Sequence, residues 1–228
     1  MNKFAIVIPA RKNSRGLKNK NVVKINNLRL IEYTFTTIKN INLPKYVITD
    51  SKLIKLISKK YKINNEFLRS KSISRSNSTL SETLKPFCEW LKKKNNKINT
   101  LIILQCTSPL TNNKDILKAI KDFNEKNLNS LFSISESFEH PYETVNLKKN
   151  NWNYNFREVQ KFRGRQEYRI NSYFINGSIF ISKMSNILKN NSIISKKHGY
   201  TIMPKSRSLD IDDKANMDRF KLLSKNNN

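Results

Sequence analysis

The sequence predicts an α/β domain with a mostly parallel sheet. Short apolar runs alternate along the chain with segments whose apolar residues recur at the helical period, which is typical of strands covered by helices. Two runs, Phe4–Ile8 and Leu101–Leu104, contain no polar residue, as expected of strands buried on both faces. The length of 228 residues suits one domain with a sizeable core.

The first half of the chain carries clear start signals for its elements. Thr79 and Glu82 form the pattern of a capping box, which predicts a helix beginning there, although Pro86 falls inside it. The other expected elements are a strand at Phe4–Ile8, a helix at Leu30–Ile38, a strand at Tyr46–Thr49, and two helices with inward faces formed by Leu53, Ile54, Leu56 and Ile57 and by Leu80, Leu84, Phe87, Cys88 and Leu91.

The second half continues the alternation after Leu101–Leu104. Asn112 or Asn113 can cap a helix, and a strong strand pattern at Phe174–Ile181 is interrupted by Asn176-Gly177. The other expected features are inward Ile116, Leu117, Ile120 and Phe123, a strand at Leu131–Ile134, a short helix, a strand near Tyr200–Met203 and a helix near Asp213–Leu223. Residues 138–170 are polar and aromatic without a helical period, so we expect a small β-rich insertion.

The composition limits the classes of function. The formal charge of +27 is typical of nucleic-acid binding, but the basic residues fall in short, widely separated clusters. Lys, Asn and Ile are all abundant and have A/T-rich codons, so genome composition accounts for much of the charge and nucleic acid is an unlikely partner. With two cysteines and two histidines, a disulfide scaffold and a His-rich metal centre are excluded. No apolar run reaches the length of a membrane span, and we expect a cytoplasmic protein.

The segment after the first strand carries the first functional motif. Five cations fall between Arg11 and Lys20, at the carboxyl end of a buried strand, where open α/β sheets bind ligands. Gly16 is one of four glycines in the chain and allows a turn whose N–H groups approach phosphate oxygens. The alternative interpretation is a solvated basic loop. The glycine patterns of dinucleotide-binding and P-loop proteins are both missing.

Two polar segments follow later strands. Gln105–Leu110 offers neutral donors and acceptors suited to sugar hydroxyls, or simply caps a turn. Asp210 and Asp212 are two residues apart, so in an extended chain their carboxylates point to one face, as Mg²⁺ with phosphates requires. The alternative is that Asp212 or Asp213 caps the last helix.

Taken in order, these motifs resemble the CMP-sialic acid synthetase family, the cytidylyltransferases that activate nonulosonic acids. The resemblance also covers Arg165-Gln166-Glu167 and Asn176-Gly177, so that five matches extend over almost the whole chain. Lys18 replaces a family proline and Thr111 a family arginine, and these departures leave the particular sugar open.

The resemblance implies a Rossmann-like nucleotide-binding domain spanning residues 1–228, with a dimerisation extension at about 138–172 in which Arg165 serves its own or the neighbouring subunit. It implies CTP and an acidic nine-carbon sugar as substrates, Mg²⁺ (or Mn²⁺) as cofactor, and a homodimer. The alternatives are a cytidylyltransferase for 3-deoxy-octulosonic, legionaminic or pseudaminic acid, or a non-catalytic basic module that binds nucleic acid. The implied residues are Ala10, Arg11, Ser14, Gly16, Lys20, Asn21 and Arg69 for the nucleotide; Arg11, Lys20, Asp210 and Asp212 for catalysis; Asp210 and Asp212 for the metal; and Gln105, Thr107, Ser108, Arg165, Gln166, Asn176 and Gly177 for the sugar.

Overall fold

Helices and strands alternate along the chain, as the sequence predicts. The computed structural model describes residues 3–12, 17, 19–69, 79–94, 97–149, 151–168 and 170–225. The strands are β1 (Phe4–Pro9), β2 (Lys24–Ile25), β3 (Leu28–Arg29), β4 (Lys45–Ile48), β5 (Thr100–Leu104), β6 (Ser130–Glu136), β7 (Val145–Lys148), β8 (Asn151–Tyr154), β9 (Tyr173–Lys183) and β10 (His198–Ile202). The helices are α1 (Leu30–Ile38), α2 (Lys52–Lys60), α3 (Leu80–Lys93), α4 (Asn113–Glu125), α5 (Met184–Asn190) and α6 (Lys214–Lys225).

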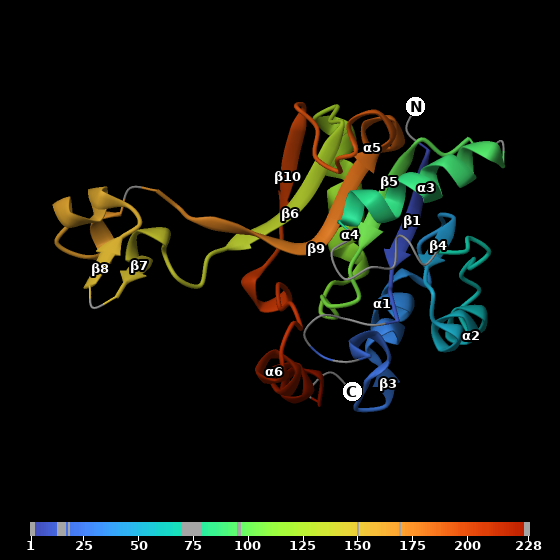
Figure 1. Cartoon of the computed structure of the whole chain (residues 1–228), viewed down its shortest axis with the longest axis horizontal. Coiled ribbons are helices and arrows are strands. Elements are labelled where there is room, and N and C mark those ends of the chain that lie inside the picture. The colour runs from blue at the N-terminus through green and yellow to red at the C-terminus, as the bar shows by residue number, and fades with distance from the viewer. Residues whose placement is uncertain are drawn as a thin grey trace.

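The central sheet is mostly parallel, which confirms the predicted fold class. Within the described part of the chain it has six strands in the order β10-β6-β9-β5-β1-β4 (Figure 1). β1 pairs in parallel with β4 and β5, and β10 pairs in parallel with β6, whereas β9 runs antiparallel to both of its neighbours. The carboxyl ends of the parallel strands therefore lie at one edge of the sheet, where ligands bind in folds of this class.

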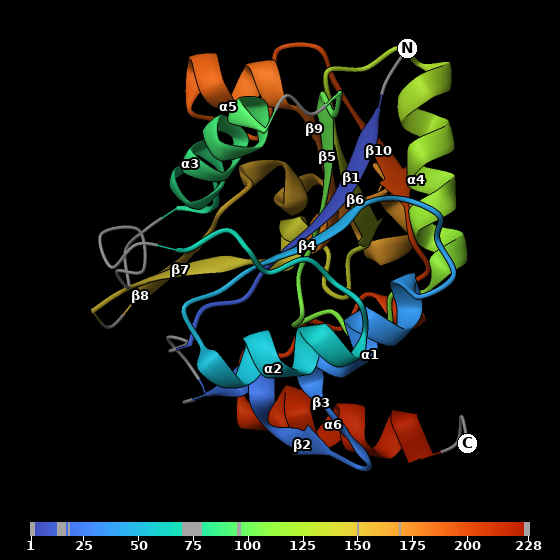
Figure 2. The ribbon, with the colours of Figure 1, turned by 90° about the vertical axis from the view of Figure 1, so that its right-hand side faces the viewer.

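Helices cover both faces of the sheet and divide the core into layers (Figure 2). On one face, Phe35 of α1, Ile54 of α2 and Phe123 of α4 pack against β1, β5 and β9. On the other face, Phe87 of α3 and Ile187 of α5 pack against the alternate residues of β1 and β5. Because successive side chains of a strand point to opposite faces, the continuous apolar runs fill both layers.

A third, smaller apolar cluster joins the C-terminal helix α6 to the segments around Ile25 and Ile211. Phe220 of α6 packs with Ile25 and Leu30 and with Leu209 and Ile211 of the segment before the helix. This cluster anchors both the short β2–β3 hairpin and the segment 208–212 below the sheet.

Some predicted inward faces are wrong. Leu53, Leu56 and Leu117 are exposed, at 39%, 59% and 52%, while Ile54 and Ile57 are buried. In α2, four apolar residues in a span of five cannot all face the core, and those nearest α1 and the sheet become buried. The Asn176-Gly177 interruption does not break β9; Gly177 adopts a φ of +71° within the strand, where the pairing with β6 shifts register.

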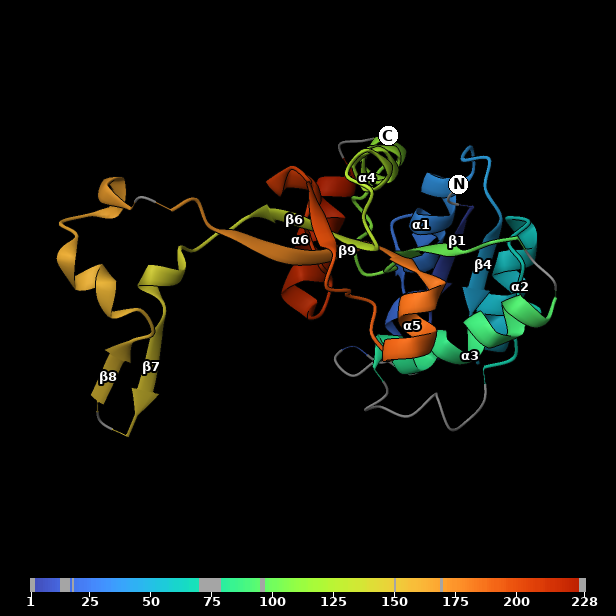
Figure 3. The ribbon, with the colours of Figure 1, turned by 90° about the horizontal axis from the view of Figure 1, so that it is seen from above.

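Residues 137–172 form an extension that reaches away from the sheet between β6 and β9 (Figures 1 and 3). Its β structure is one antiparallel hairpin, β7–β8, and the described remainder includes short 3-10 turns, so the insertion is less β-rich than predicted. Tyr142 contacts Phe156, Phe162 and Tyr168, and these rings form the small core of the extension.

Candidate active site

Segments distant in sequence meet at the carboxyl edge of the sheet. Ala10 continues β1 and is held by a hydrogen bond from its N–H to the carbonyl of Ile48, at 2.9 Å. Ala10 is fully buried, so its contact with a ligand stays a prediction. Arg11 follows at the surface edge. The predicted phosphate-binding residues Ser14 and Gly16 lie outside the described residues.

Lys20 and Asp212 form an ion pair that joins the two ends of the chain. The Lys20 Nζ lies 2.7 Å from the Asp212 Oδ1, although the residues are 192 positions apart. Lys20 is only 6% exposed, whereas the Asp212 side chain is 73% exposed. Asp213, and not Asp212, caps helix α6, because the Asn216 N–H donates to the Asp213 Oδ1 at 2.7 Å. Asp212 is therefore not committed to capping and remains open to the surface of the site.

Asp210 presents a partly buried carboxylate beside this pair. Burial raises the pKa of Asp210, the nearby charge of Asp212 raises it further, and the Thr107 hydroxyl and Lys20 oppose these effects. The Asp210 Oδ1 is buried without a hydrogen-bond partner. Burying a carboxylate oxygen without a partner costs folding free energy, unless a cation or a hydrogen-bond donor pairs with it.

The two carboxylates fit a divalent cation that is shared with a substrate. The described residues contain no group of three or more His, Cys, Asp or Glu side chains that could hold a metal. Mg²⁺ is commonly held by one or two carboxylates together with substrate phosphates and water. The unpartnered oxygen of Asp210 and the exposed Asp212 match that pattern.

A second set of charges surrounds the end of β4. The Lys12 N–H donates to the Asp50 Oδ1 at 2.7 Å. The pKa of Arg69 is lowered chiefly by burial, with Asp50 opposing and Arg11 adding to the effect, so the three charges lie close together. Arg69 also donates to the Thr83 Oγ1 at 3.3 Å. Asp50 has no assigned role among the predicted site residues, although Thr49-Asp50 resembles a family segment that follows an early strand, and it lies two residues after β4.

Asn21 holds the basic segment in place. Its Nδ2 donates to the carbonyl of Arg11 at 3.1 Å, and the residue is 8% exposed. This bond fixes the backbone of Arg11 relative to Lys20.

The turn after β5 lies between the acidic pair and β9. The Ile211 N–H donates to the carbonyl of Thr107 at 2.8 Å, which fastens the acidic segment to this turn. The Thr107 Oγ1 lies 3.5 Å from the Gln105 Oε1, and a side chain at Gly177 would meet the Gln105 amide at 3.8 Å. Gln105, Thr107 and Gly177 thus lie close together, and their contact with a sugar stays a prediction.

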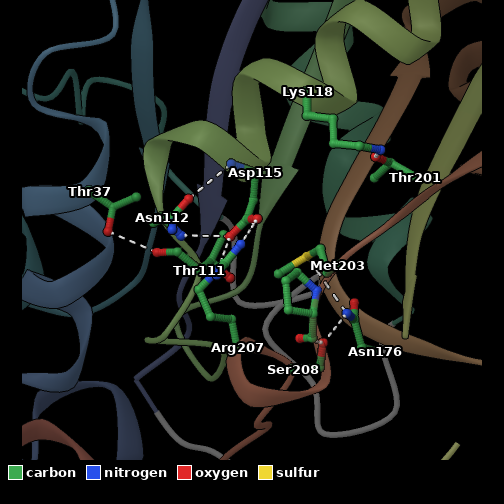
Figure 4. A network of polar contacts seen from close by, with 11 residues as sticks. Thr37, Thr111, Asn112, Asp115, Lys118, Asn176, Thr201, Met203, Arg207 and Ser208 are labelled. Atoms are coloured by element: carbon green, nitrogen blue, oxygen red, sulfur yellow. Dashed lines mark hydrogen bonds and ion pairs between the residues drawn. The ribbon is translucent and has the colours of Figure 1, made fainter. Parts of the chain in front are cut away.

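Several other predicted residues occupy different surroundings. Ser108 is buried and lines a small cavity of about 10 Å³ together with Thr111 and Ser178. Asn176 is 3% exposed, and its amide oxygen accepts from the Ser133 hydroxyl at 2.5 Å. Its amide nitrogen donates to the Ser208 Oγ at 2.9 Å (Figure 4). Both side chains face the interior, and their contact with a sugar stays a prediction.

Arg165 and Gln166 lie in the extension, away from the edge of the sheet (Figures 1 and 3). Arg165 donates to the Glu143 Oε1 at 2.5 Å and lies 3.8 Å from the Glu139 Oε2. Gln166 is exposed. A single chain therefore does not bring these two residues to the other predicted site residues.

The two cysteines are buried and unpaired. Burial raises the pKa of Cys106 to about 12, and that of Cys88 also to about 12. Both thiols stay protonated at neutral pH, so neither acts as a nucleophile. Among the described residues, no helix is both long enough and apolar enough to cross a membrane.

A mostly parallel sheet with clustered cations and a carboxylate pair at its carboxyl edge is the arrangement expected of a nucleotide-binding fold. A solved structure of CMP:2-keto-3-deoxy-manno-octonic acid synthetase complexed with CTP has the same fold. It aligns with a TM-score of 0.70 over 100% of both chains, at 14% identity.

Sequence comparison places the chain more closely. The cytidylyltransferase family model matches residues 5–217. The post-translational flagellin modification protein B of Campylobacter coli is 30% identical over 100% of this chain and 97% of its own length. The pseudaminic acid cytidylyltransferase of Campylobacter jejuni is 27% identical over 97% of this chain and 96% of its own. The chain belongs to the cytidylyltransferase family and is a nucleotidyltransferase.

Proposed function

We propose that the enzyme transfers CMP from CTP to the anomeric hydroxyl of a nonulosonic acid. The sugar oxygen forms a bond to the α-phosphorus, the bond from that phosphorus to the β-phosphate oxygen breaks, and pyrophosphate leaves while the hydroxyl proton passes to water. The observation that carries this proposal is the junction of Lys20, Asp210 and Asp212 at the carboxyl edge of the sheet.

The triphosphate would occupy the basic side of this junction. Nucleotidyl transfer depends chiefly on alignment and on neutralisation of charge that develops on the leaving group. Lys20 and Arg11 supply positive charge there, and Arg69, held near Asp50, is placed to bind the nucleoside with Asn21. Ser14 and Gly16 would complete the phosphate cradle. Asp210 and Asp212 would hold Mg²⁺ (or Mn²⁺), which when bound offsets phosphate charge and polarises the reacting oxygens.

The sugar would lie on the side of Gln105, Thr107 and Gly177, with Arg165 supplied by a second copy of the chain. A guanidinium is a natural partner for the sugar carboxylate, and Arg165 lies in the extension that reaches away from the sheet. A homodimer is supported by the exposed apolar side chains of the extension, among them Leu147 at 80% and Trp152 at 51%. A cavity of about 710 Å³ also opens among residues of the extension.

The particular sugar is the least constrained part of the proposal. One relative carries the name pseudaminic acid cytidylyltransferase. Sialic, legionaminic and 3-deoxy-octulosonic acids share the carboxylate and the anomeric hydroxyl that the reaction needs. Two buried free thiols and the use of CTP support a cytoplasmic setting.

Pyrophosphate release tests the proposal directly. The assay contains CTP, Mg²⁺ and each of the four acids in turn, with ATP, GTP and UTP as nucleotide controls. Release with CTP and one acid is the expected result and identifies the sugar. Folded protein that neither releases pyrophosphate nor binds CTP, but binds RNA in a salt-sensitive way, would favour the basic binding module instead.

A further inference from the structure

A partly buried ion pair between Arg207 and Asp115 ties the acidic segment, residues 208–212, to helix α4 (Figure 4). The Arg207 Nε lies 2.9 Å from the Asp115 Oδ2, and its Nη2 lies 2.7 Å from the Asp115 Oδ1. Asp115 is 5% exposed and the Arg207 side chain 33%. Two parallel charge-assisted hydrogen bonds fix the direction of the guanidinium as well as its distance.

The Asp115 end of the pair is rigid. Asp115 completes the capping box of α4: its Oδ2 accepts from the Asn112 N–H at 3.1 Å, and its own N–H donates to the Asn112 Oδ1 at 3.0 Å. The carboxylate also lies in the first turn of the helix, where the helix dipole favours negative charge. Arg207 is therefore held by a carboxylate that cannot turn away without opening the helix end.

Arg207 lies three residues before Asp210 and five before Asp212, in the same short segment. Ser208 follows, and its hydroxyl donates to the carbonyl of Pro204 at 2.9 Å while accepting from Asn176. Ile211 is fully buried and bonds the turn after β5. Asp210 and Asp212 flank Ile211, so the position of both carboxylates depends on where this short segment is fastened.

We propose that Arg207, through Asp115, is a positioning residue that sets Asp210 and Asp212 for metal binding; this rests on the metal role that the proposed function gives to them. The position of the carboxylates matters because metal–oxygen distances tolerate deviations of only about 0.2 Å. A lysine at position 207 keeps the charge but cannot reproduce the two-bond fork. Groups that orient metal ligands in this way typically change metal affinity by about 10-fold to 100-fold when they are altered.

The test measures Mn²⁺ affinity by electron paramagnetic resonance in the full-length protein with CTP present and no sugar. Arg207→Lys and Asp115→Asn should each weaken Mn²⁺ binding by about 10-fold or more. In Asp115→Asn the amide oxygen can still accept from Asn112, so the helix cap is preserved. In the pyrophosphate assay kcat should fall, and the KM for CTP should change little.

Lys118→Met is the matched control. Lys118 also joins α4 to another element, because its Nζ contacts the Asp122 Oδ2 at 2.9 Å and the Thr201 Oγ1 of β10 at 3.1 Å. It does not touch the acidic segment, so its loss should leave Mn²⁺ affinity unchanged. Thermal unfolding of each variant separates a change in stability from a change in the site.

The outcomes separate this inference from the proposed function. If Asp212→Asn loses Mn²⁺ binding while Arg207→Lys and Asp115→Asn bind as wild type does, the positioning role is wrong and the metal site stands. If Arg207→Lys loses stability as Lys118→Met does, with unchanged Mn²⁺ affinity, the ion pair is merely structural and the inference fails. If wild type binds Mn²⁺ with no dependence on Asp212, the metal site itself is wrong.

Discussion

The edge of the sheet and the extension are built in opposite ways. At the edge, Lys20 and Ile211 are buried, and hydrogen bonds to residues far away in sequence fix the charged groups. In the extension, Val159 is the only buried apolar side chain among the described residues, and Leu147 and Trp152 are exposed. Packing within one chain thus holds the described charged groups at the edge of the sheet. The extension has apolar surface left over, which a second copy could cover.

The largest expected effect is at the rigid edge. Asp212→Asn removes the exposed carboxylate beside Lys20, so turnover should fall on the order of 100-fold to 1000-fold. The measurement is pyrophosphate release as a function of Mg²⁺ concentration. Asp213→Asn is the matched control, since asparagine caps a helix as well as aspartate does and should leave the rate near wild type. Equal rates for the two variants would place the acidic pair outside the chemistry.

The next effect tests whether the extension acts on a neighbouring subunit. Arg165→Ala alone should lower turnover by about 100-fold, because the guanidinium partner of the sugar carboxylate is lost. Mixing it with Asp212→Asn after unfolding and refolding should restore roughly a quarter of wild-type activity, since half of the symmetric dimers then carry one intact site.

Arg163→Ala, another exposed arginine of the extension, is the control and should retain the wild-type rate. A mixture no more active than its components would mean that Arg165 serves its own subunit or none.

A smaller effect concerns the apolar surface of the extension. Leu147→Lys places a charge on a side chain that is 80% exposed in one chain. If a second copy covers it, burying that charge weakens the dimer by about 10-fold or more. Sedimentation velocity over a dilution series measures this. Leu222→Lys, at a 68% exposed position of α6, should leave the association unchanged. If both variants dissociate at the same concentration, the β7–β8 hairpin does not lie in the dimer interface.

The sequence predicts the sheet and helices well, because the hydrophobic period and the capping residues can be read from residues that are close together in the sequence. Helix α1 begins and ends at the expected residues, and the Thr79 box opens α3 as predicted. Which apolar residues of a helix face the core depends more on elements that are distant in the sequence. Leu53 and Leu117 fit a helical stripe but lie on the outer side, since the sheet and neighbouring helices decide which part of the stripe is covered.

The sequence predicts the position of site residues that directly follow strands. It does not predict side-chain contacts between residues that are far apart in the sequence. Arg11, Lys20 and the acidic pair follow recognisable segments and meet at one edge. Asn176 was assigned to the sugar, yet its amide is used by Ser133 and Ser208, 43 and 32 residues away. Nothing in the local sequence marks Asp115 as the partner of Arg207, because the pair forms only when α4 and the acidic segment are packed together.

The smallest expected effect is a gain in stability at the rigid edge. Burial raises the pKa of Asp210, so the folded protein binds its proton more tightly than the unfolded chain does. The free energy of unfolding therefore falls as the pH rises through the interval between the ordinary and the raised pKa, and the cost is complete above it. Asp210→Asn removes this cost and should raise the Tm at neutral pH by about 2–4 °C in metal-free buffer.

Asp212→Asn should instead lower the Tm slightly, because it leaves the buried Lys20 without its carboxylate. Calorimetry of both variants from neutral to acidic pH provides the check. The advantage of Asp210→Asn should shrink toward acid, where the wild-type carboxyl group is protonated in both states. A lower Tm for Asp210→Asn at neutral pH would mean that the Asp210 carboxylate stabilises the fold. A higher Tm together with lost activity would mean that the folded edge holds a carboxylate whose burial costs stability and whose charge serves catalysis.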